Sequence, residues 1–190
     1  MARLISTILL LTGFAFASCS KQNDAAPETA ANCSQYAAGD VMVGIKANVS
    51  INTVFAWIGS TGLRLYQANG FTYVSGLPAD SLAYVKRTLM SKPYLNTRGF
   101  TAGNEYVHAA DHKIHVLDFL FDMTPANQAD WLQTMKTLQL VDEGGAGCQG
   151  CKDIYLKVPA GSEKYWVDEL AKHPAANWAE LNCLGGMVLH

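Results

Sequence analysis

The amino-acid sequence predicts an α+β fold in which one unit, with the order strand, helix, strand, strand, helix, strand, occurs twice. Segments 77–93 and 158–174 align without a gap and share six identical residues, which indicates an internal repeat. Strand-like alternation and helix-like periodicity precede both segments in the same order. The chain is 49% hydrophobic and 16% charged, a composition typical of a folded core. The identical pairs are Pro78 and Pro159, Ala79 and Ala160, Ser81 and Ser162, Tyr84 and Tyr165, Leu89 and Leu170, and Pro93 and Pro174.

The first strand and first helix of each copy have clear sequence signals. Apolar residues alternate with others over 41–45, and segment 115–119 alternates in the same way in the second copy. Ser50 precedes an apolar pattern with helical spacing and is expected to cap that helix. Thr124, followed by Pro125, is expected to begin the equivalent helix in the second copy.

The later strands are shorter and are placed by the repeat. Asn69-Gly70 is a hairpin signal, so we expect the strands before and after it to pair with each other. The expected strands are 63–66 and 71–74 in the first copy and 138–141 and 153–156 in the second, and the last strands of the two copies are expected at 94–100 and 178–182.

This order of elements is that of the split βαβ, or ferredoxin-like, motif. The predicted fold is therefore two tandem ferredoxin-like repeats, each an antiparallel sheet with its helices packed on one face. The first repeat is placed at 41–100, the linker at 101–112, the second repeat at 113–182 and a C-terminal tail at 183–190. One larger α+β domain that uses both copies in a single sheet is the alternative.

The N-terminus predicts export and lipidation. Arg3 is followed by an apolar run over 4–16 and then by Ala17-Ser18, so residues 1–18 are expected to be a signal peptide. The position of Cys19 directly after these small residues resembles a bacterial lipobox, which implies that Cys19 is acylated. Segment 19–40 is polar and is expected to be a flexible lipidated tether. Ordinary cleavage, with Cys19 as a plain thiol, is the alternative.

The charge and the motif content exclude several classes of function. The net charge is −2 and no basic block is present, so nucleic acid is not an expected partner. The sequence contains neither a nucleophile elbow nor a glycine-rich phosphate loop. We therefore expect neither enzymatic activity nor a cofactor.

The four cysteines besides Cys19 are disulfide candidates, because the chain is expected to be exported. We expect the pairs Cys148 with Cys151 and Cys33 with Cys183, with the second pair joining the tether to the tail. A redox-active pair at Cys148 and Cys151 is the main alternative, and a zinc site is a weaker one.

The remaining candidate residues are histidines and tryptophans. His108, His112 and His115 fall within eight residues and are expected to be solvated, without a bound metal. The alternative is a metal site in which His108 and His112 share one helical face. Trp166 and Trp178 have no aromatic counterpart in the first copy, so they are the expected binding-surface residues.

The lipobox, the polar tether and the duplicated Pro-Ala-x-Ser segments together resemble small bacterial outer-membrane lipoproteins of unassigned function. This resemblance implies a membrane-tethered, non-catalytic binding module of the cell envelope. Its partners would be the lipid bilayer, through acylated Cys19, and an envelope protein or other extracytoplasmic ligand. A looser resemblance, in topology only, is to the propeptide and inhibitor domains of subtilisin-like proteases. Protease inhibition is therefore an alternative, beside a thiol redox protein that uses Cys148 and Cys151.

Overall fold

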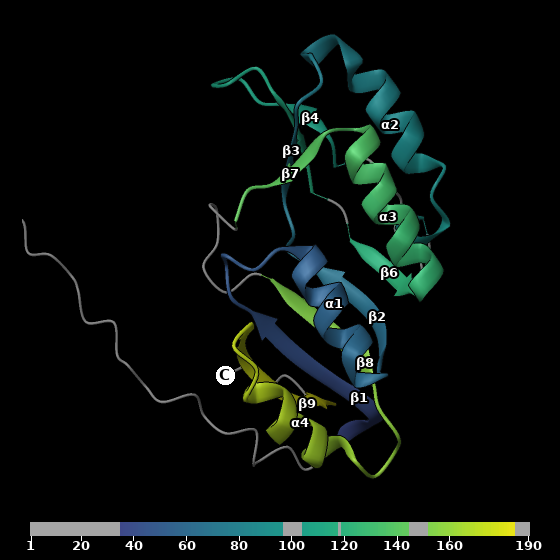
Figure 1. Ribbon diagram of the computed structural model, residues 1–190, viewed down its shortest axis with the longest axis vertical. Helices are drawn as coiled ribbons and strands as arrows, with labels where there is room; N and C mark the ends of the chain where they lie inside the picture. Colours follow the sequence, from purple (N-terminus) through teal and green to yellow (C-terminus); the bar gives the residue numbers. More distant parts are fainter. Residues whose placement is uncertain (1–34, 97–103, 118, 145–151, 185–190) are drawn as a thin grey trace, which may run out of the picture.

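The computed structural model describes residues 35–96, 104–117, 119–144 and 152–184 (Figure 1). Within these ranges, four α-helices pack with a five-stranded and a four-stranded antiparallel sheet. The predicted α+β class is therefore confirmed. The helices are α1 (Ile51–Thr61), α2 (Leu82–Met90), α3 (Pro125–Thr137) and α4 (Glu163–Ala171).

The larger sheet has the strand order β6-β2-β8-β1-β9, and each neighbouring pair is antiparallel. Its central region is formed by β1 and β8, which run side by side from Asp40 opposite Lys157 to Gly44 opposite Asp153. Helices α1 and α4 lie against this sheet (Figure 1). Its strands are β1 (Tyr36–Ile45), β2 (Arg64–Asn69), β6 (Leu120–Met123), β8 (Asp153–Lys157) and β9 (Ala176–Cys183).

The smaller sheet has the strand order β4-β5-β3-β7 and is made of short strands. Helices α2 and α3 lie beside it (Figure 1). Its strands are β3 (Tyr73–Ser75), β4 (Tyr106–Val107), β5 (Ile114–Val116) and β7 (Leu140–Asp142). Strand β4 lies inside the segment 101–112, which the sequence predicted to be a linker.

Strand pairing does not follow the predicted division at 41–100 and 113–182. The five-stranded sheet takes β1 and β2 from the first range and β6, β8 and β9 from the second. The four-stranded sheet also combines strands from both copies. The alternative prediction was one sheet that uses strands of both copies. The structure has two such sheets, and each contains strands of both copies. An alternating pattern identifies a strand but not its partner, and this is why the pairing differs from the prediction.

The expected hairpin at Asn69-Gly70 is one such difference. Gly70 does have a positive φ of 71°. However, β2 pairs with β6 and β8, whereas β3 pairs with β5 and β7. The chain therefore passes from one sheet to the other at residues 70–72. It does the same between β5 and β6 and between β7 and β8, because the members of each pair belong to different sheets.

The helix starts agree with the sequence. The hydroxyl oxygen of Ser50 accepts a hydrogen bond from the backbone N–H of Thr53 at 3.3 Å. That of Thr124 accepts one from the N–H of Asn127 at 3.2 Å. These side chains satisfy backbone donors that the first helical turn leaves unpaired.

The predicted last strand of the first copy is wrong where the structure describes it. Residues Pro93–Leu95 form a 3₁₀ turn, in which the N–H of Asn96 donates to the carbonyl of Pro93 at 3.2 Å. The side-chain amide of Asn96 also donates to the backbone carbonyls of Met90 and Lys92, and these bonds close the C-terminal end of α2. Tyr94 and Leu95 are both buried, whereas a half-buried strand would bury only every second residue. Residues 97–100 lie outside the described ranges. The other predicted final strand, 178–182, is confirmed within β9.

One hydrophobic core connects the two sheets. Val43 and Ile154 contribute to it from the five-stranded sheet, and Ile114 and Val116 contribute from the four-stranded sheet. Trp131 of α3 is fully buried, and its ring lies edge-on to Tyr73 with the centroids 5.6 Å apart. The two sheets therefore share a single hydrophobic core.

Candidate functional site

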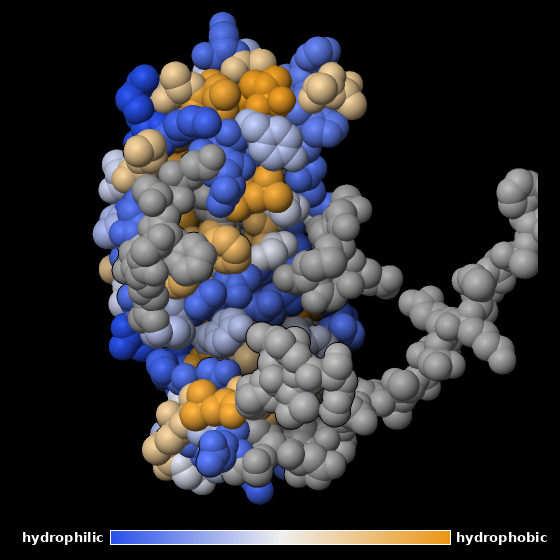
Figure 2. Space-filling model, turned by 180° about the vertical axis from the view of Figure 1, so that it is seen from behind, coloured by the Kyte–Doolittle hydropathy of each residue, from blue (hydrophilic) through white to orange (hydrophobic). Residues whose placement is uncertain are grey.

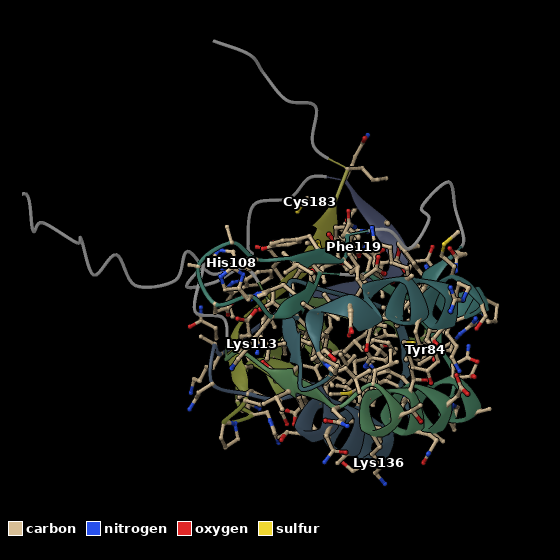
Figure 3. The ribbon with its side chains drawn as sticks, turned by 90° about the horizontal axis from the view of Figure 1, so that it is seen from above. Tyr84, His108, Lys113, Phe119, Lys136 and Cys183 are labelled. Carbon is tan, nitrogen blue, oxygen red and sulfur yellow. The ribbon has the colours of Figure 1, made fainter. Side chains whose placement is uncertain are left out.

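A pocket of about 690 Å³ opens where the chain crosses between the two sheets. This volume lies within the range that is usual for small-ligand sites. The labelled Phe119, which lines the pocket, lies on the side of the molecule opposite the helix that carries Lys136 (Figure 3). The lining residues are Asn69, Gly70, Phe71, Thr72, Asn104, Glu105, Tyr106, Leu117, Phe119 and Asp153.

The walls of the pocket are largely apolar. Phe71 is buried, with 1% of its surface exposed. Leu117, Phe119 and Tyr106 are 38%, 37% and 44% exposed, and all three line the same pocket. The back of the molecule carries several such hydrophobic patches between hydrophilic residues (Figure 2). Within the pocket, these exposed side chains offer a surface for the apolar part of a ligand.

Glu105 is the most unusual residue of the pocket. Its side chain is only 2% exposed, and neither carboxylate oxygen has a hydrogen-bond partner among the described residues. Burial of an unpaired carboxylate is unfavourable, because the group loses water without gaining a partner. The pocket lining therefore includes a buried acceptor without a hydrogen-bond partner among the described residues.

A second carboxylate, that of Asp153, lies in the same pocket. The side-chain amide of Asn69 donates to its Oδ1 at 2.6 Å. Burial raises the pKa of Asp153 above its ordinary value, and the hydrogen bond from Asn69 opposes part of this shift. Its environment therefore disfavours the ionised carboxylate. A positive charge placed nearby would favour the ionised form instead.

The buried cation next to the pocket is already paired. The ammonium of Lys152 lies 5.0 Å from the ring centroid of Phe71. It donates to Oδ1 of Asp142 at 2.8 Å and to the carbonyl of Val49 at 3.0 Å. Lys152 thus directs its hydrogen bonds away from Glu105 and Asp153, and the lining of the pocket carries an excess of negative charge.

A cluster of histidines adjoins the pocket on the hairpin formed by β4 and β5. Oδ1 of Asp111 lies 3.5 Å from Nδ1 of His108, and Oδ2 of Asp111 lies 3.1 Å from Nε2 of His115. The ring of Tyr106, which lines the pocket, stacks on that of His115 with the centroids 5.6 Å apart. The pKa of Asp111 is lowered to about 2, first by the backbone N–H of Lys113 and then by His115.

The structure brings two of the three predicted histidines into this cluster. His112 instead forms the turn, with a positive φ of 55° and its N–H donating to the carbonyl of His108 at 2.9 Å. The helix needed to place His108 and His112 on one face is absent from the described hairpin. His115 is not fully solvated as expected, since its side chain is only 12% exposed.

The predicted binding-surface residues Trp166 and Trp178 do not line the pocket. The indole of Trp178 covers Gly44 of β1, and a Cβ added to Gly44 would lie 2.2 Å from this ring. Trp166 packs partly against the core, with the ring of Tyr165 edge-on to it at 5.3 Å. Sequence reasoning missed Phe71, Leu117 and Phe119, because their alternating pattern is the same as that of an ordinary strand.

Of the cysteines, only Cys183 lies within the described residues; Cys19, Cys33, Cys148 and Cys151 lie outside them. Cys183 ends β9 opposite Tyr36 of β1, and the N–H of Leu184 donates to the carbonyl of Gln35 at 2.9 Å. The end of β9 is therefore next to the start of β1, close in sequence to Cys33. The proposed pairing of Cys33 with Cys183 remains a prediction, and so does that of Cys148 with Cys151.

No helix in the described part of the chain combines the length and the apolar character needed to cross a bilayer. Comparison with protein-family models, with curated proteins and with solved structures returns no match. The functional assignment therefore depends on the chemistry of the pocket and of the hairpin beside it.

Proposed function

We propose that this chain is a lipid-anchored binding module of the bacterial cell envelope, and that its pocket holds a ligand without transforming it. The ligand has an apolar or aromatic body and one ammonium or guanidinium group. The observation that carries this proposal is the buried carboxylate of Glu105, which has no hydrogen-bond partner among the described residues.

Charge complementarity favours a cationic group. An ammonium placed at Glu105 would form charge-assisted hydrogen bonds with its carboxylate. Its positive charge would also stabilise the ionised form of Asp153, whose pKa burial raises. Binding would thereby remove two unfavourable features of the empty pocket.

The walls favour an apolar body next to that charge. Tyr106 and Phe119 are the exposed aromatic side chains of the lining, and Leu117 adds an aliphatic surface. An aromatic ring can contact an apolar group through dispersion and a nearby cation through its π face. A strongly hydrated ion without an apolar part would leave these walls uncovered, so a simple metal ion or inorganic anion is not the proposed ligand.

The fold supports a pocket at this position. Two βαβ halves, β1-α1-β2 and β8-α4-β9, interleave in the larger sheet with β1 and β8 inside. In the smaller sheet, β3 and β5 lie inside, between β4 and β7. We propose that each sheet is a ferredoxin-like unit assembled from half of each repeat, with β6 as an additional edge strand. In such an exchange the connections must cross between the sheets, and the pocket is lined at two of these crossings.

The location in the cell envelope is supported by sequence alone. The lipobox-like residues before Cys19 and the polar segment 19–40 would tether the folded part to an outer membrane. The redox and protease-inhibitor alternatives depend on Cys148, Cys151 and the tail, most of which lie outside the described ranges. No contact among the described residues favours either alternative over the pocket.

Binding can be tested with the full chain and two matched probes, 2-phenylethylamine and its neutral counterpart 2-phenylethanol. We expect the amine to raise the unfolding temperature and the alcohol to have little effect, because only the amine supplies a positive charge. Glu105→Gln should weaken amine binding by about tenfold or more, the size of one lost charge-assisted hydrogen bond. Glu180→Gln, which changes an exposed carboxylate on β9, is the control. Equal binding of both probes, or binding unaffected by Glu105→Gln, would contradict the proposal.

The anchor requires a separate measurement. Intact protein extracted from membranes and alkylated without reduction should carry a lipid-sized mass increase on Cys19. If Cys33, Cys148, Cys151 and Cys183 form two disulfides, none of them will be alkylated. An unmodified N-terminus would remove the membrane from the proposed function, and alkylation at Cys148 and Cys151 would favour the redox alternative.

A further inference from the structure

We propose that the hairpin formed by β4 and β5 binds a divalent transition-metal ion, with Zn²⁺ as the reference case. The ligands are the imidazoles of His108 and His115 and the carboxylate of Asp111. Glu143 is a positioning residue that orients His115. This site is distinct from the ligand-binding function proposed for the pocket, and it revises the sequence-based expectation of solvated histidines without a metal.

The backbone of the hairpin places the three ligands together. Strand pairing sets Tyr106 opposite His115, and the N–H of His108 donates to the carbonyl of Lys113 at 2.9 Å. The left-handed conformation of His112 closes the turn between the strands. Asp111 is held by the N–H of Lys113, which donates to its Oδ1 at 3.1 Å. The ligands are therefore positioned by hydrogen bonds that are present without a metal.

The spacing of the side chains fits one ion after a small adjustment. One ligand atom from each of His108, Asp111 and His115 lies within 4.8 Å of the other two. In a tetrahedral zinc site with bonds of about 2 Å, neighbouring ligand atoms are about 3.3 Å apart. The two oxygens of Asp111 each face one imidazole near this spacing, with Oδ1 at 3.5 Å from His108 and Oδ2 at 3.1 Å from His115. To share one ion through a single carboxylate oxygen, the side chains must shift, and the side chain of His108 is 45% exposed, so it has room to rotate.

Glu143 provides an independent observation in favour of a metal. Nδ1 of His115 lies 3.3 Å from Oε2 of Glu143, while Nε2 faces Asp111. With a cation bound at Nε2, the N–H of the imidazole lies on Nδ1 and can donate to Glu143. Metal-bound histidines are commonly oriented in this way by a carboxylate on the far nitrogen.

The donor atoms select the type of ion. Two imidazole nitrogens and one carboxylate oxygen suit zinc and neighbouring transition metals, whereas calcium and magnesium prefer oxygen ligands alone. Three protein ligands leave one coordination position open. Because Tyr106 lines the pocket and stacks on His115, the proposed metal site adjoins the proposed ligand site.

The test is titration of the full chain with Zn²⁺ alone, by calorimetry and without reductant, so that paired cysteines do not compete for the metal. We expect one zinc ion to bind at the hairpin. His108→Ala and Asp111→Asn should each weaken binding at least tenfold, and Glu143→Gln should weaken it by about 10- to 100-fold. His112→Asn is the matched control in the same turn, because Asn tolerates the left-handed conformation, and it should change the affinity less than twofold.

Two further readouts keep the outcome unambiguous. Long-range ¹H–¹⁵N spectra should show zinc-dependent shifts for the ring nitrogens of His108 and His115, and not for those of His173, which stacks on Trp57. The Glu105→Gln variant should bind zinc normally, so that failure of the pocket proposal and failure of the metal proposal are distinguishable. Absence of zinc binding would overturn the inference. So would binding that survives His108→Ala or is lost in a Cys148→Ser, Cys151→Ser double variant.

Discussion

Both sheets of this protein combine strands from the ranges 41–100 and 113–182, yet they differ greatly in strand length. In the five-stranded sheet, β1 has ten residues and β9 has eight. In the four-stranded sheet, β3, β5 and β7 have three residues each and β4 has two. One sheet is therefore built on long strands, with register shifts in the pairing of β1 and of β2, and the other is built on short strands.

The unusual chemistry is associated with the short sheet. Glu105 and the histidine cluster lie on or beside β4 and β5, and Phe119 follows β5. In contrast, Trp178 of the long sheet is used for packing over Gly44. Short strands leave more residues in turns and crossovers, where side chains are free to face a ligand. The short sheet and its connections supply Glu105 and the histidine cluster, whereas the long sheet contributes Asn69 and Asp153 to the same pocket.

The largest expected effect tests whether the two sheets are one folding unit. Ile154 of the long sheet and Ile114 of the short sheet are both fully buried in the same hydrophobic cluster. Substitution of either by Ala should lower the free energy of unfolding by about 2–5 kcal/mol, through lost burial and the cavity left behind. We expect a single transition for both variants in urea, followed by tryptophan fluorescence and circular dichroism.

A different result for Ile114→Ala would break this comparison. If the short sheet unfolds independently, that variant will show two transitions, whereas Ile154→Ala will show a single shifted one. The continuous core would then have to be regarded as two separate cores in contact.

A smaller effect is expected at the close approach between β1 and β9. Gly44→Ala places a Cβ within 2.2 Å of the indole of Trp178, so the ring or the strand must move. We expect destabilisation by about 1–3 kcal/mol, as for other overpacked positions. Gly59→Ala in α1 is the control, because an added Cβ there meets no atom within 4 Å and Ala favours the helix. Equal effects of the two substitutions on the urea midpoint would show that Trp178 does not hold β9 against β1.

A substitution in the pocket should raise the stability of the protein, whereas the core substitutions above should lower it. Glu105→Gln removes a buried carboxylate without a hydrogen-bond partner among the described residues, and it should raise stability by about 1 kcal/mol. The same variant should lose affinity for 2-phenylethylamine. A gain in stability with a loss of binding would show that the short sheet retains an unfavourable group for its function. Destabilisation by this conservative change would instead indicate that Glu105 has a structural partner, and the thermal unfolding midpoint distinguishes the two cases.

Local features of the fold were predictable from sequence, and strand partners were not. Ser50 and Thr124 identified the starts of α1 and α3 because a cap depends on a few neighbouring residues. Strands β3 and β8 occupy equivalent places in the two copies but pair in different sheets. Since both copies present similar alternating patterns, their halves can exchange partners without any change in the local signal.

The candidate site could not be predicted from the sequence for a related reason. Its residues come from segments around 69–72, 104–106 and 117–119 and from Asp153, which only the crossing of the sheets brings together. Glu105 lay in the predicted linker, and a single acidic residue in a linker gives no sign that it will be buried. The histidine cluster was visible as three nearby histidines, but the turn at His112 decides which of them converge.

The smallest expected effect is a pH dependence of the free energy of unfolding that arises from Glu163. This residue joins α4 to β1 in the long sheet. Its carboxylate accepts hydrogen bonds from the N–H groups of Gly39 at 2.7 Å and of Gly161 at 2.9 Å, where positive φ angles turn both glycines toward it. The bond from Gly39 contributes most to lowering the pKa of Glu163 below its ordinary value of 4.5. Because the folded-state pKa is depressed, this stabilisation is present above pH 4.5 and is lost as the pH falls through the lower, folded-state value.

Urea midpoints measured at pH 7 and at successively lower pH should therefore decline in the native chain below about 4.5, and this decline should be shallower in Glu163→Gln. The control, Glu180→Gln, removes an exposed carboxylate on β9 and should retain the native slope. If Glu163→Gln and the native chain respond identically to acid, the hydrogen bonds from Gly39 and Gly161 do not help to anchor α4 on the long sheet, and apolar packing alone holds the helix there.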